Sequence, residues 1–253
     1  MGRVISISNQ KGGVGKTTSA INISAFLAEK GQRVLIIDID PQANAGFGLG
    51  INPENVNTTI YEVLIGQTPI KNAIVKTEVE SLYIIPSNIH LSGAQVELLN
   101  VNDREFILKN ALKEIKNSFD FIFIDCPPSL GILTLNSLVA ADTVIIPLQC
   151  EYYALEGLSQ LLKVIAMVQK SLNKKLKIEG VILTMYDPRT NLSQQIVSDV
   201  REYFKDKTLK TIVSRNVKLA EAPSFGKPIG LYDRDCSGSE SYIRLAEEVL
   251  NNG

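Results

Sequence analysis

The sequence predicts an α/β protein with a mostly parallel, twisted sheet that carries helices on both faces. Short apolar runs rich in β-branched residues alternate with longer segments of helical periodicity. The apolar runs are continuous, as in strands that are buried on both faces, and strands that alternate with helices favour parallel βαβ crossovers. A chain of 253 residues with 45% hydrophobic content is long enough for one large core, so we expect a single domain over 1–253.

The elements follow one another regularly along the chain. Strands are predicted at 3–8, 33–38, 82–86, 119–125, 142–148 and 178–185. Helices are predicted near 16–30, 103–117, 131–141, 153–172, 191–205 and 237–250. The segment 41–80 is less regular and rich in glycine and proline; it is either a mobile switch region or a passive connection. Ligands of open parallel sheets bind beyond the carboxyl ends of the strands, and the motifs below fall there.

Composition argues against several classes of protein. No run of 18 or more apolar residues is present, and the chain enters its first strand directly, so we expect neither a membrane span nor a secretory signal, and a cytoplasmic location. Cys126, Cys150 and Cys236 stand singly, which argues against a disulfide framework and against a zinc or iron–sulfur site. The one histidine, His90, is expected in a solvated loop, which leaves a Ser-His-Asp triad without its base.

Charge is unevenly distributed along the chain. The formal net charge is −1, but residues 163–227 contain 13 Lys and Arg against 6 Asp and Glu. A block of this kind can generate a local positive field on a nearly neutral molecule.

The stretch "GGVGKTT" follows the first strand and opens the first helix, the context expected of a phosphate-binding loop. Its glycines allow a tight turn in which backbone N–H groups point at phosphate oxygens, at the positive end of the helix. Lys16 is then expected at the β- and γ-phosphates and the Thr17 hydroxyl at Mg²⁺. The match has one defect, because Gln10 stands where the pattern requires glycine.

Three aspartates end predicted strands. Asp125 closes "FIFID" and is expected beside the metal; the alternative is that it caps the next turn. Asp38 and Asp40 are spaced by two and point to the same side if the strand continues. One of them is expected to support hydrated Mg²⁺ and the other to position the attacking water.

Five segments of the chain form a recognisable set: "KGGVGKTT", "VLIIDIDPQANA", "FIFIDCPPSLG", "QCEYYALEGLSQL" and "SRNVKLAEAPSFGKPI". Together, in the same order and over nearly the whole chain, they resemble the ParA/Soj family of deviant Walker A ATPases, P-loop NTPases that partition chromosomes and plasmids. The first also marks a wider superfamily that includes MinD and the nitrogenase iron protein. The last two are narrower and are most similar to the chromosomal Soj type.

This resemblance implies site residues and cofactors. ATP with Mg²⁺ would bind to Lys11, Gly12, Gly13, Val14, Gly15, Lys16, Thr17 and Thr18, with Thr18 at the α-phosphate side. Asp40 would orient the attacking water, and Thr17, Asp38 and Asp125 would surround the metal. Adenine contacts are expected near Met185, Asp187 and Asn216. ATP hydrolysis would be slow until a partner completes the site.

The resemblance also implies partners. In such proteins the lysine equivalent to Lys11 reaches across an ATP-sandwich homodimer to the partner's phosphates, and Gly12 permits the close approach; the alternative is that Lys11 contacts its own subunit's phosphates or solvent. Dimers would bind nonspecific double-stranded DNA through Arg189, Arg215 and Lys218, on the nucleoid, and meet a ParB-type centromere-binding protein. The wider patch is expected to include Lys207, Lys210, Lys227 and Arg234. A role in replication control is neither supported nor excluded.

The main alternative is MinD-like cycling on a membrane surface. It requires a basic amphipathic helix at the C-terminus, whereas "SESYIRLAEEVLNNG" carries Glu240, Glu247 and Glu248 against Arg244. We therefore expect this helix to pack on the body of the protein, without stable membrane association. An iron–sulfur carrier is a third class, for which Cys126 and Cys150 have no recognisable spacing.

Overall fold

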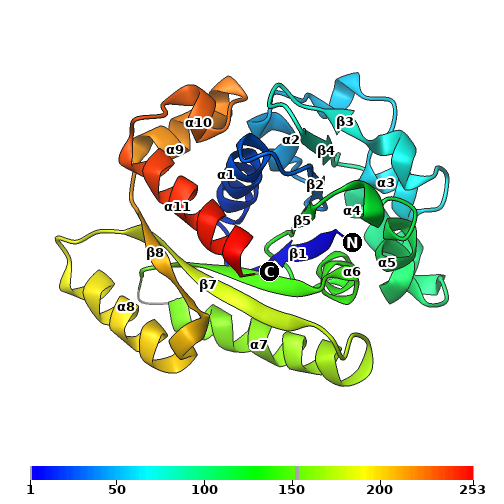
Figure 1. Ribbon diagram of the computed structural model, residues 1–253. Coiled ribbons are helices and arrows are strands. Elements are labelled where there is room, and N and C mark those ends of the chain that lie inside the picture. Colours follow the sequence, from blue (N-terminus) through cyan, green and yellow to red (C-terminus); the bar gives the residue numbers. More distant parts are fainter. Residues whose placement is uncertain (1, 152–153, 253) are drawn as a thin grey trace.

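One eight-stranded sheet forms the centre of the molecule (Figure 1). The computed structural model describes residues 2–151 and 154–252, and only the backbone of 154–157. The strand order is β3-β4-β2-β5-β1-β6-β7-β8, and every neighbouring pair is parallel except β3 and β4. The strands are β1 (Arg3–Ile7), β2 (Val34–Asp38), β3 (Val75–Lys76), β4 (Leu82–Ile85), β5 (Phe121–Asp125), β6 (Thr143–Gln149), β7 (Lys177–Tyr186) and β8 (Thr208–Ser214).

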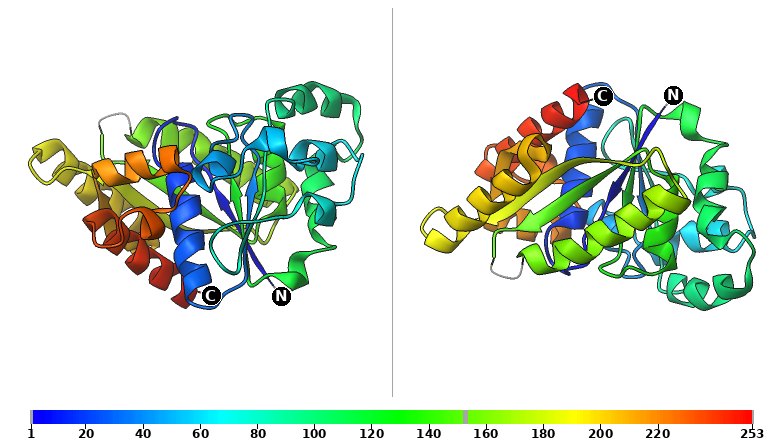
Figure 2. Two further views of the ribbon diagram at one scale, coloured as in Figure 1. Left: turned by 90° about the horizontal axis from the view of Figure 1, so that it is seen from above. Right: turned by 90° about the horizontal axis from the view of Figure 1, so that it is seen from below.

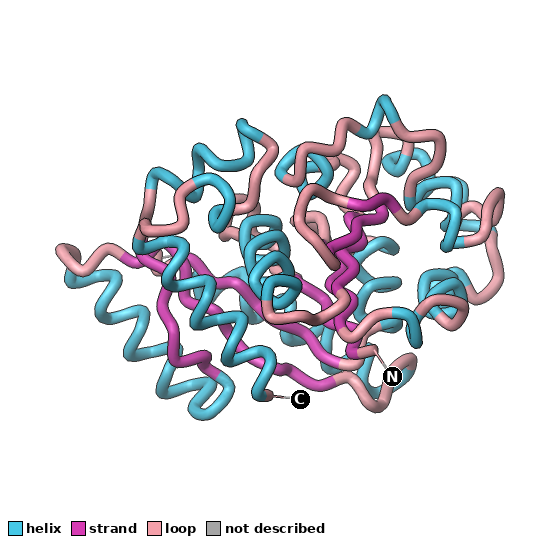
Figure 3. The backbone as a smooth tube through the Cα atoms, turned by 45° about the horizontal axis from the view of Figure 1, so that its top comes forward, coloured by secondary structure: helices cyan, strands magenta, loops and turns pink. Residues whose placement is uncertain are grey.

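Helices cover both faces of this sheet (Figures 1 and 2). They are α1 (Lys16–Glu29), α2 (Asn44–Gly48), α3 (Ile60–Leu64), α4 (Leu91–Glu97), α5 (Ile107–Leu112), α6 (Ile132–Ala140), α7 (Ala154–Ser171), α8 (Asn191–Phe204), α9 (Val217–Glu221), α10 (Ile229–Tyr232) and α11 (Ser237–Asn251). In Figure 3 the strands run through the middle of the molecule with helices on either side.

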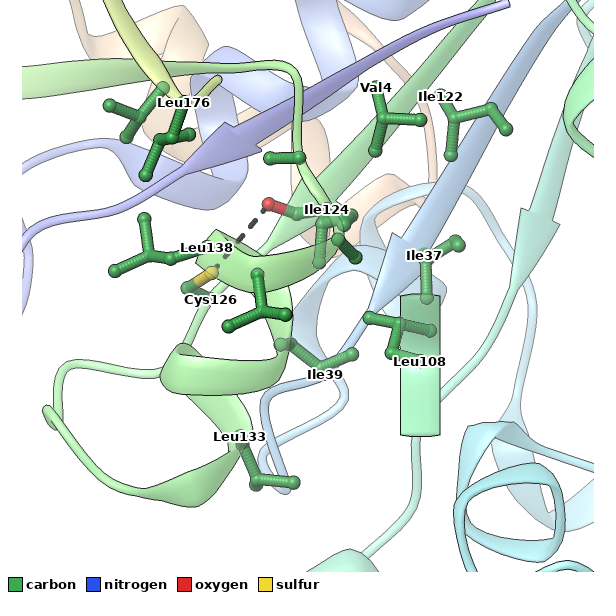
Figure 4. Close-up of a cluster of buried hydrophobic side chains, with 14 of the residues drawn as sticks. Val4, Ile37, Ile39, Leu108, Ile122, Ile124, Cys126, Leu133, Leu138 and Leu176 are labelled. Carbon is green, nitrogen blue, oxygen red and sulfur yellow. Dashed lines mark hydrogen bonds between the residues drawn. The ribbon is translucent and has the colours of Figure 1, made fainter. Parts of the chain in front are cut away.

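The strands contribute alternate side chains to two hydrophobic cores. Ile5 and Ile36 pack with α1, α10 and α11 on one face. Val4 and Ile37 pack with α3 to α8 on the other, and Figure 4 shows part of that second core. Because both faces are buried, the strands need apolar side chains at successive positions. The continuous runs of the sequence thus have a direct structural cause.

The predicted fold class is confirmed, and so are the six predicted strands, which correspond to β1, β2, β4, β5, β6 and β7. The predicted helices correspond to α1, α6, α7, α8 and α11, with residue 153 outside the described residues. The helix predicted at 103–117 is wrong in extent, since only α5 is α-helical there, between short 3₁₀ turns at Arg104–Phe106 and Lys116–Ser118. The segment 41–80 contains α2 and α3.

The strand β8 was not predicted, and its position explains why. It lies at the edge of the sheet, and only Leu209 and Val213 of its sequence "TLKTIVS" are buried. The backbone N–H groups of Lys210 and Thr211 on its outer side donate to the carboxylate of Glu248 in α11 at 2.7 and 2.8 Å. A polar cap of this kind protects an edge strand from pairing with another chain.

Candidate functional site

The phosphate loop connects the carboxyl end of β1 to the amino end of α1. Gly13 and Gly15 have φ angles of 73° and 86°, in the left-handed region that favours glycine. Gly15 is the N-cap of α1 and provides no side-chain hydrogen bond to the first turn. The first N–H groups of the helix are therefore available to an anion at its positive end.

Two buried polar side chains hold this loop in place. The amide of Asn9 donates to the carbonyl of Pro147 at 2.7 Å and accepts from the backbone of Lys11 at 3.0 Å. The hydroxyl of Thr184 donates to the carbonyl of Val14 at 2.9 Å. Sequence reasoning did not predict these two positioning residues. Each is a polar residue near the carboxyl end of a buried strand, and this pattern in the sequence could have identified them.

Asp38 and Asp125 lie opposite each other at the ends of the adjacent strands β2 and β5. Asp38 is fully buried and accepts from the backbone N–H groups of Asp40 and Ala45, both at 3.0 Å. Asp125 accepts from the Thr17 hydroxyl at 2.6 Å through one oxygen, while its other oxygen is buried without a partner among the described residues. The strand order thus gathers carboxylates that are 87 positions apart in sequence.

Burial shapes the protonation of these groups. Burial raises the pKa of Asp125 to about 7, against the opposing effects of Thr17 and Lys16. Burial, followed by the charge of Asp125, raises the pKa of Asp38 well above its ordinary value. Burial also lowers the pKa of Lys16, opposed by the charge of Asp125. An additional cation would favour the charged form of both carboxylates.

The residues present fit a magnesium ion shared with phosphate. In proteins Mg²⁺ takes one or two carboxylates and keeps its other positions for water and substrate phosphates. The unpartnered oxygen of Asp125 and the hydroxyl of Thr17 supply two oxygen atoms beside the phosphate loop. Among the described residues no group of three or more His, Cys, Asp and Glu side chains is arranged to hold a metal by protein ligands alone. A magnesium ion held here would thus depend on the nucleotide.

A cavity of about 560 Å³ opens above the phosphate loop. Its walls bring together eight of the predicted site residues, namely Gly12, Gly13, Gly15, Lys16, Thr17, Thr18, Asp40 and Met185. Val14, Asp38 and Asp125 are buried beneath it. The lining residues that sequence reasoning missed include Gln42 and Asn44, which directly follow Asp40, and Lys227 near the C-terminus. This arrangement can hold a polyphosphate at a helix N-terminus, in a cavity lined by two lysines and one aspartate.

A second cavity of about 240 Å³ shares Gly15, Thr18 and Met185 with the first. Its lining also includes Asn216 and the apolar side chains of Val213 and Leu219 at the end of β8 and the start of α9. Met185 has a φ of 52°, which is uncommon for a residue with a side chain. A flat, mostly apolar ligand group fits here, directly beside the phosphate loop.

Of the three residues predicted to contact adenine, two line the second cavity and one does not. Met185 and Asn216 line the second cavity, and Asn216 also caps α9 by accepting from the backbone of Lys218 at 2.8 Å. Asp187 lines neither of these cavities. Its carboxylate accepts two hydrogen bonds from the Arg189 guanidinium, at 2.7 and 2.8 Å, and these hold the pKa of Asp187 at about 2.

The Lys11 side chain lies outside both cavities and pairs with Glu151 at 3.5 Å. The other carboxylate oxygen of Glu151 is 3.4 Å from the guanidinium of Arg215. One carboxylate therefore contacts both the lysine predicted to reach across a dimer and an arginine predicted to bind DNA. Tyr152, Tyr153 and the side chains of 154–157, which continue the family motif after Glu151, lie outside the described residues.

The three cations predicted to bind DNA lie near the carboxyl ends of β7 and β8. Arg189 follows β7, and the backbone N–H of Arg215, after β8, donates to the carbonyl of Tyr186 at 3.0 Å. Arg189 and Arg215 are exposed and Lys218 is partly exposed, and each is paired with a carboxylate, Lys218 with Glu221 at 3.0 Å. Exposed pairs of this kind are weak and are readily exchanged for phosphate.

The C-terminal helix α11 packs against the body, next to α1 and β8. Tyr242, Leu245, Ala246 and Val249 are buried in the core, and the hydroxyl groups of Tyr242 and Ser19 are 3.1 Å apart. Its buried apolar stripe is therefore not presented to a lipid surface. In the described part of the chain, no helix has the length and apolar character needed to cross a membrane.

The chain is similar to known proteins over nearly its whole length. Residues 2–178 match a family model described as an AAA domain. The sporulation initiation inhibitor protein Soj of Bacillus subtilis is 55% identical over 100% of both chains. The chromosome partitioning protein ParA of Myxococcus xanthus is 55% identical over 99% of this chain and 88% of its own. A solved structure of cobyrinic acid a,c-diamide synthase from Mycobacterium smegmatis, with bound ATP analogue and magnesium, is 39% identical with a TM-score of 0.87, over 99% of this chain and 95% of that one.

Proposed function

We propose that ATP binding switches this chain between a monomer and a DNA-binding dimer. The chain belongs to the Soj/ParA family of chromosome-partitioning ATPases. The observation that carries this proposal is the 560 Å³ cavity, whose walls combine a phosphate loop with Lys16, Thr17 and Asp40. Full-length identity of 55% to partitioning proteins favours this activity over the amide synthesis named for the 39% identical structure.

The roles of the site residues follow from their positions. Lys16 and the loop N–H groups bind the β- and γ-phosphates, and Thr17 and Asp125 hold magnesium, with Asp38 behind them. When bound, magnesium neutralises charge on the phosphates during transfer. Asp40 lines the cavity, and its carboxylate orients the attacking water. Met185 and Asn216 receive the adenine in the smaller cavity.

Dimerisation depends on Lys11. Two nucleotides that face each other across an interface repel, and a cation donated by each subunit to its partner's phosphates reverses the sign of that interaction. The Lys11 ion pair with Glu151 is partly exposed, so its loss costs about 1 kcal/mol or less. Lys11 is therefore free to exchange Glu151 for a phosphate.

DNA binding follows from dimerisation. Arg189, Arg215 and Lys218 form one weak patch on each subunit, and two such patches on one dimer bind with an increased effective concentration. Their binding to phosphates is independent of sequence and falls steeply with salt. We place the ATP-bound dimer on the nucleoid, and we assign the release step to hydrolysis, slow alone and stimulated by a ParB-type partner.

Light scattering tests this function most simply. The monomer has a mass of 27.8 kDa. With MgATP the measured mass is expected to double, and the dimer is expected to bind nonspecific duplex at low salt; with MgADP or without nucleotide the mass stays that of one chain. A single-chain mass under all conditions would contradict the proposal. Binding of MgATP-loaded protein to anionic vesicles instead of duplex would favour the membrane alternative.

A further inference from the structure

Lys227 occupies a wall of the nucleotide cavity that the proposed function leaves without a role. In the described part of the chain, Lys16 and Lys227 are the two basic side chains that line the 560 Å³ cavity, and Asp40 is the one acidic side chain that lines it. The lining side chains thus carry one net positive charge before any ligand is present. A cavity with this balance, at a helix N-terminus, favours an anionic ligand.

The backbone on either side of Lys227 is fixed. Gly226 has a φ of 64°, and a Cβ atom there would lie 2.7 Å from the Cα of Gly50, so only glycine allows this close packing on the segment after α2. The backbone N–H of Lys227 donates to Ala222 at 3.3 Å, and that of Ile229 donates to the side chain of Asn22 in α1 at 2.7 Å. Lys227 is therefore held beside the first turns of α1.

The charge of Lys227 is also uncommitted. Arg189, Arg215, Lys218 and Arg234 each form an ion pair with a carboxylate of this chain. Among the described residues the ammonium group of Lys227 has neither an ion pair nor a hydrogen bond. Sequence reasoning assigned Lys227 to the outer edge of the DNA patch, but Lys227 lines the nucleotide cavity together with Thr18 and Asn22.

We propose that Lys227 is a nucleotide-binding residue that contacts the phosphate chain on the α-phosphate side. The first turns of α1 indicate which phosphate Lys227 contacts. Thr18 is expected at the α-phosphate, and Asn22 lies one helical turn further along α1. Because Asn22 holds the segment that contains Lys227, Lys227 lies on the α-phosphate side. The inference rests on the proposed function, because it requires a nucleoside polyphosphate in this cavity. It adds a second cation that recognises the part of the ligand common to ATP and ADP.

Calorimetric titration with MgATP and MgADP tests this role in four proteins: the parent, Lys227→Ala, Lys227→Arg and the control Lys210→Ala. Lys210 is an exposed lysine of the same basic block on β8. A charge-assisted contact predicts about tenfold weaker binding of both nucleotides to Lys227→Ala. Lys227→Arg keeps the charge and is expected to recover most of the affinity, while Lys210→Ala stays at the parent value.

Three results would overturn the assignment. Unchanged affinity of Lys227→Ala for both nucleotides would show that Lys227 does not bind the nucleotide. Weaker salt-dependent binding of duplex by the same variant would assign Lys227 to the DNA patch instead. Weakened binding of MgATP alone would move the contact to the γ-phosphate. If the parent bound neither nucleotide, the proposed function itself would fail and this inference with it. Thermal unfolding of each variant shows whether a loss of affinity reflects loss of folding; if Lys227→Ala does not fold, Lys227→Gln gives the same comparison.

Discussion

The ammonium group of Lys11 and the carboxylate of Glu151 form an ion pair at 3.5 Å, and the same carboxylate contacts Arg215. Lys11 is the residue that we expect to bind the partner's nucleotide, and Arg215 is expected to bind DNA. Both cations thus have an internal counter-ion. Glu151 is therefore expected to weaken the binding of Lys11 to the partner's nucleotide and of Arg215 to DNA, because a phosphate must displace Glu151 in each case.

Replacing Glu151 tests this competition. In Glu151→Gln both cations lose their counter-ion, so we expect about threefold tighter binding of duplex at low salt and dimerisation at lower protein concentration. Electrophoretic mobility and light scattering measure the two effects. Glu80→Gln, at an exposed position before β4, removes the same charge elsewhere and is expected to behave as the parent. Equal behaviour of the two variants would show that Glu151 restrains neither cation.

Arg189 is expected to carry much of the DNA affinity. Arg189→Glu should form ATP-dependent dimers that no longer bind duplex, and duplex binding equal to that of the parent would show that the patch is misplaced.

Asp187→Asn should bind duplex about threefold more tightly, because it removes the carboxylate that now holds the Arg189 guanidinium.

The Asp187 effect has a defined pH dependence. The pKa of Asp187 is about 2, below its ordinary value, so the carboxylate is charged throughout pH 5–8 and loses its charge only in strong acid. The difference between Asp187→Asn and the parent is therefore expected to be constant across pH 5–8. A difference that vanished toward pH 5 would contradict this assignment.

Lys16 is expected to be essential for nucleotide binding. Its ammonium group is largely buried and donates to the carbonyl of Lys11 at 3.2 Å, so it lies within the phosphate loop. Lys16→Ala should lose measurable affinity for MgATP in calorimetric titration. Undiminished affinity in a folded Lys16→Ala variant would remove the phosphate-loop assignment.

Asp40 is expected to act in hydrolysis and not in binding. Its carboxylate accepts from the backbone of Gln42 at 3.0 Å, which fixes it at the cavity wall. Asp40→Ala should bind MgATP with parental affinity, form lasting dimers and release phosphate at least about a hundredfold more slowly. Parental turnover in this variant would transfer the role to another residue.

Much of the fold was predictable, since its strands are buried on both faces and appear as unbroken apolar runs. Elements that lack this feature were missed. The edge strand β8 has only two buried residues, Leu209 and Val213, and α9 and α10 contain only five and four residues. The predicted helix at 103–117 failed because helical periodicity there continues across 3₁₀ turns on both sides of α5.

The site was predictable where one short motif contains it. Lys16 and Thr17 belong to such a motif, and Asp38 and Asp125 were found because each ends a strand. Asn9 and Thr184 were missed as residues that position the loop, and Lys227 was missed as a residue of the cavity lining, since these contacts join segments far apart in the chain. The pairing of Lys11 with Glu151 was equally hidden, as 140 positions separate the two residues.

A structure of the Asp40→Ala variant with MgATP tests the central claim most directly. We predict a dimer in which the Lys11 ammonium group has left Glu151 and lies about 3 Å from a phosphate oxygen of the nucleotide bound to the partner. An ammonium group that stays on Glu151, or that contacts only the nucleotide of its own subunit, would contradict the claim that ATP joins the two copies.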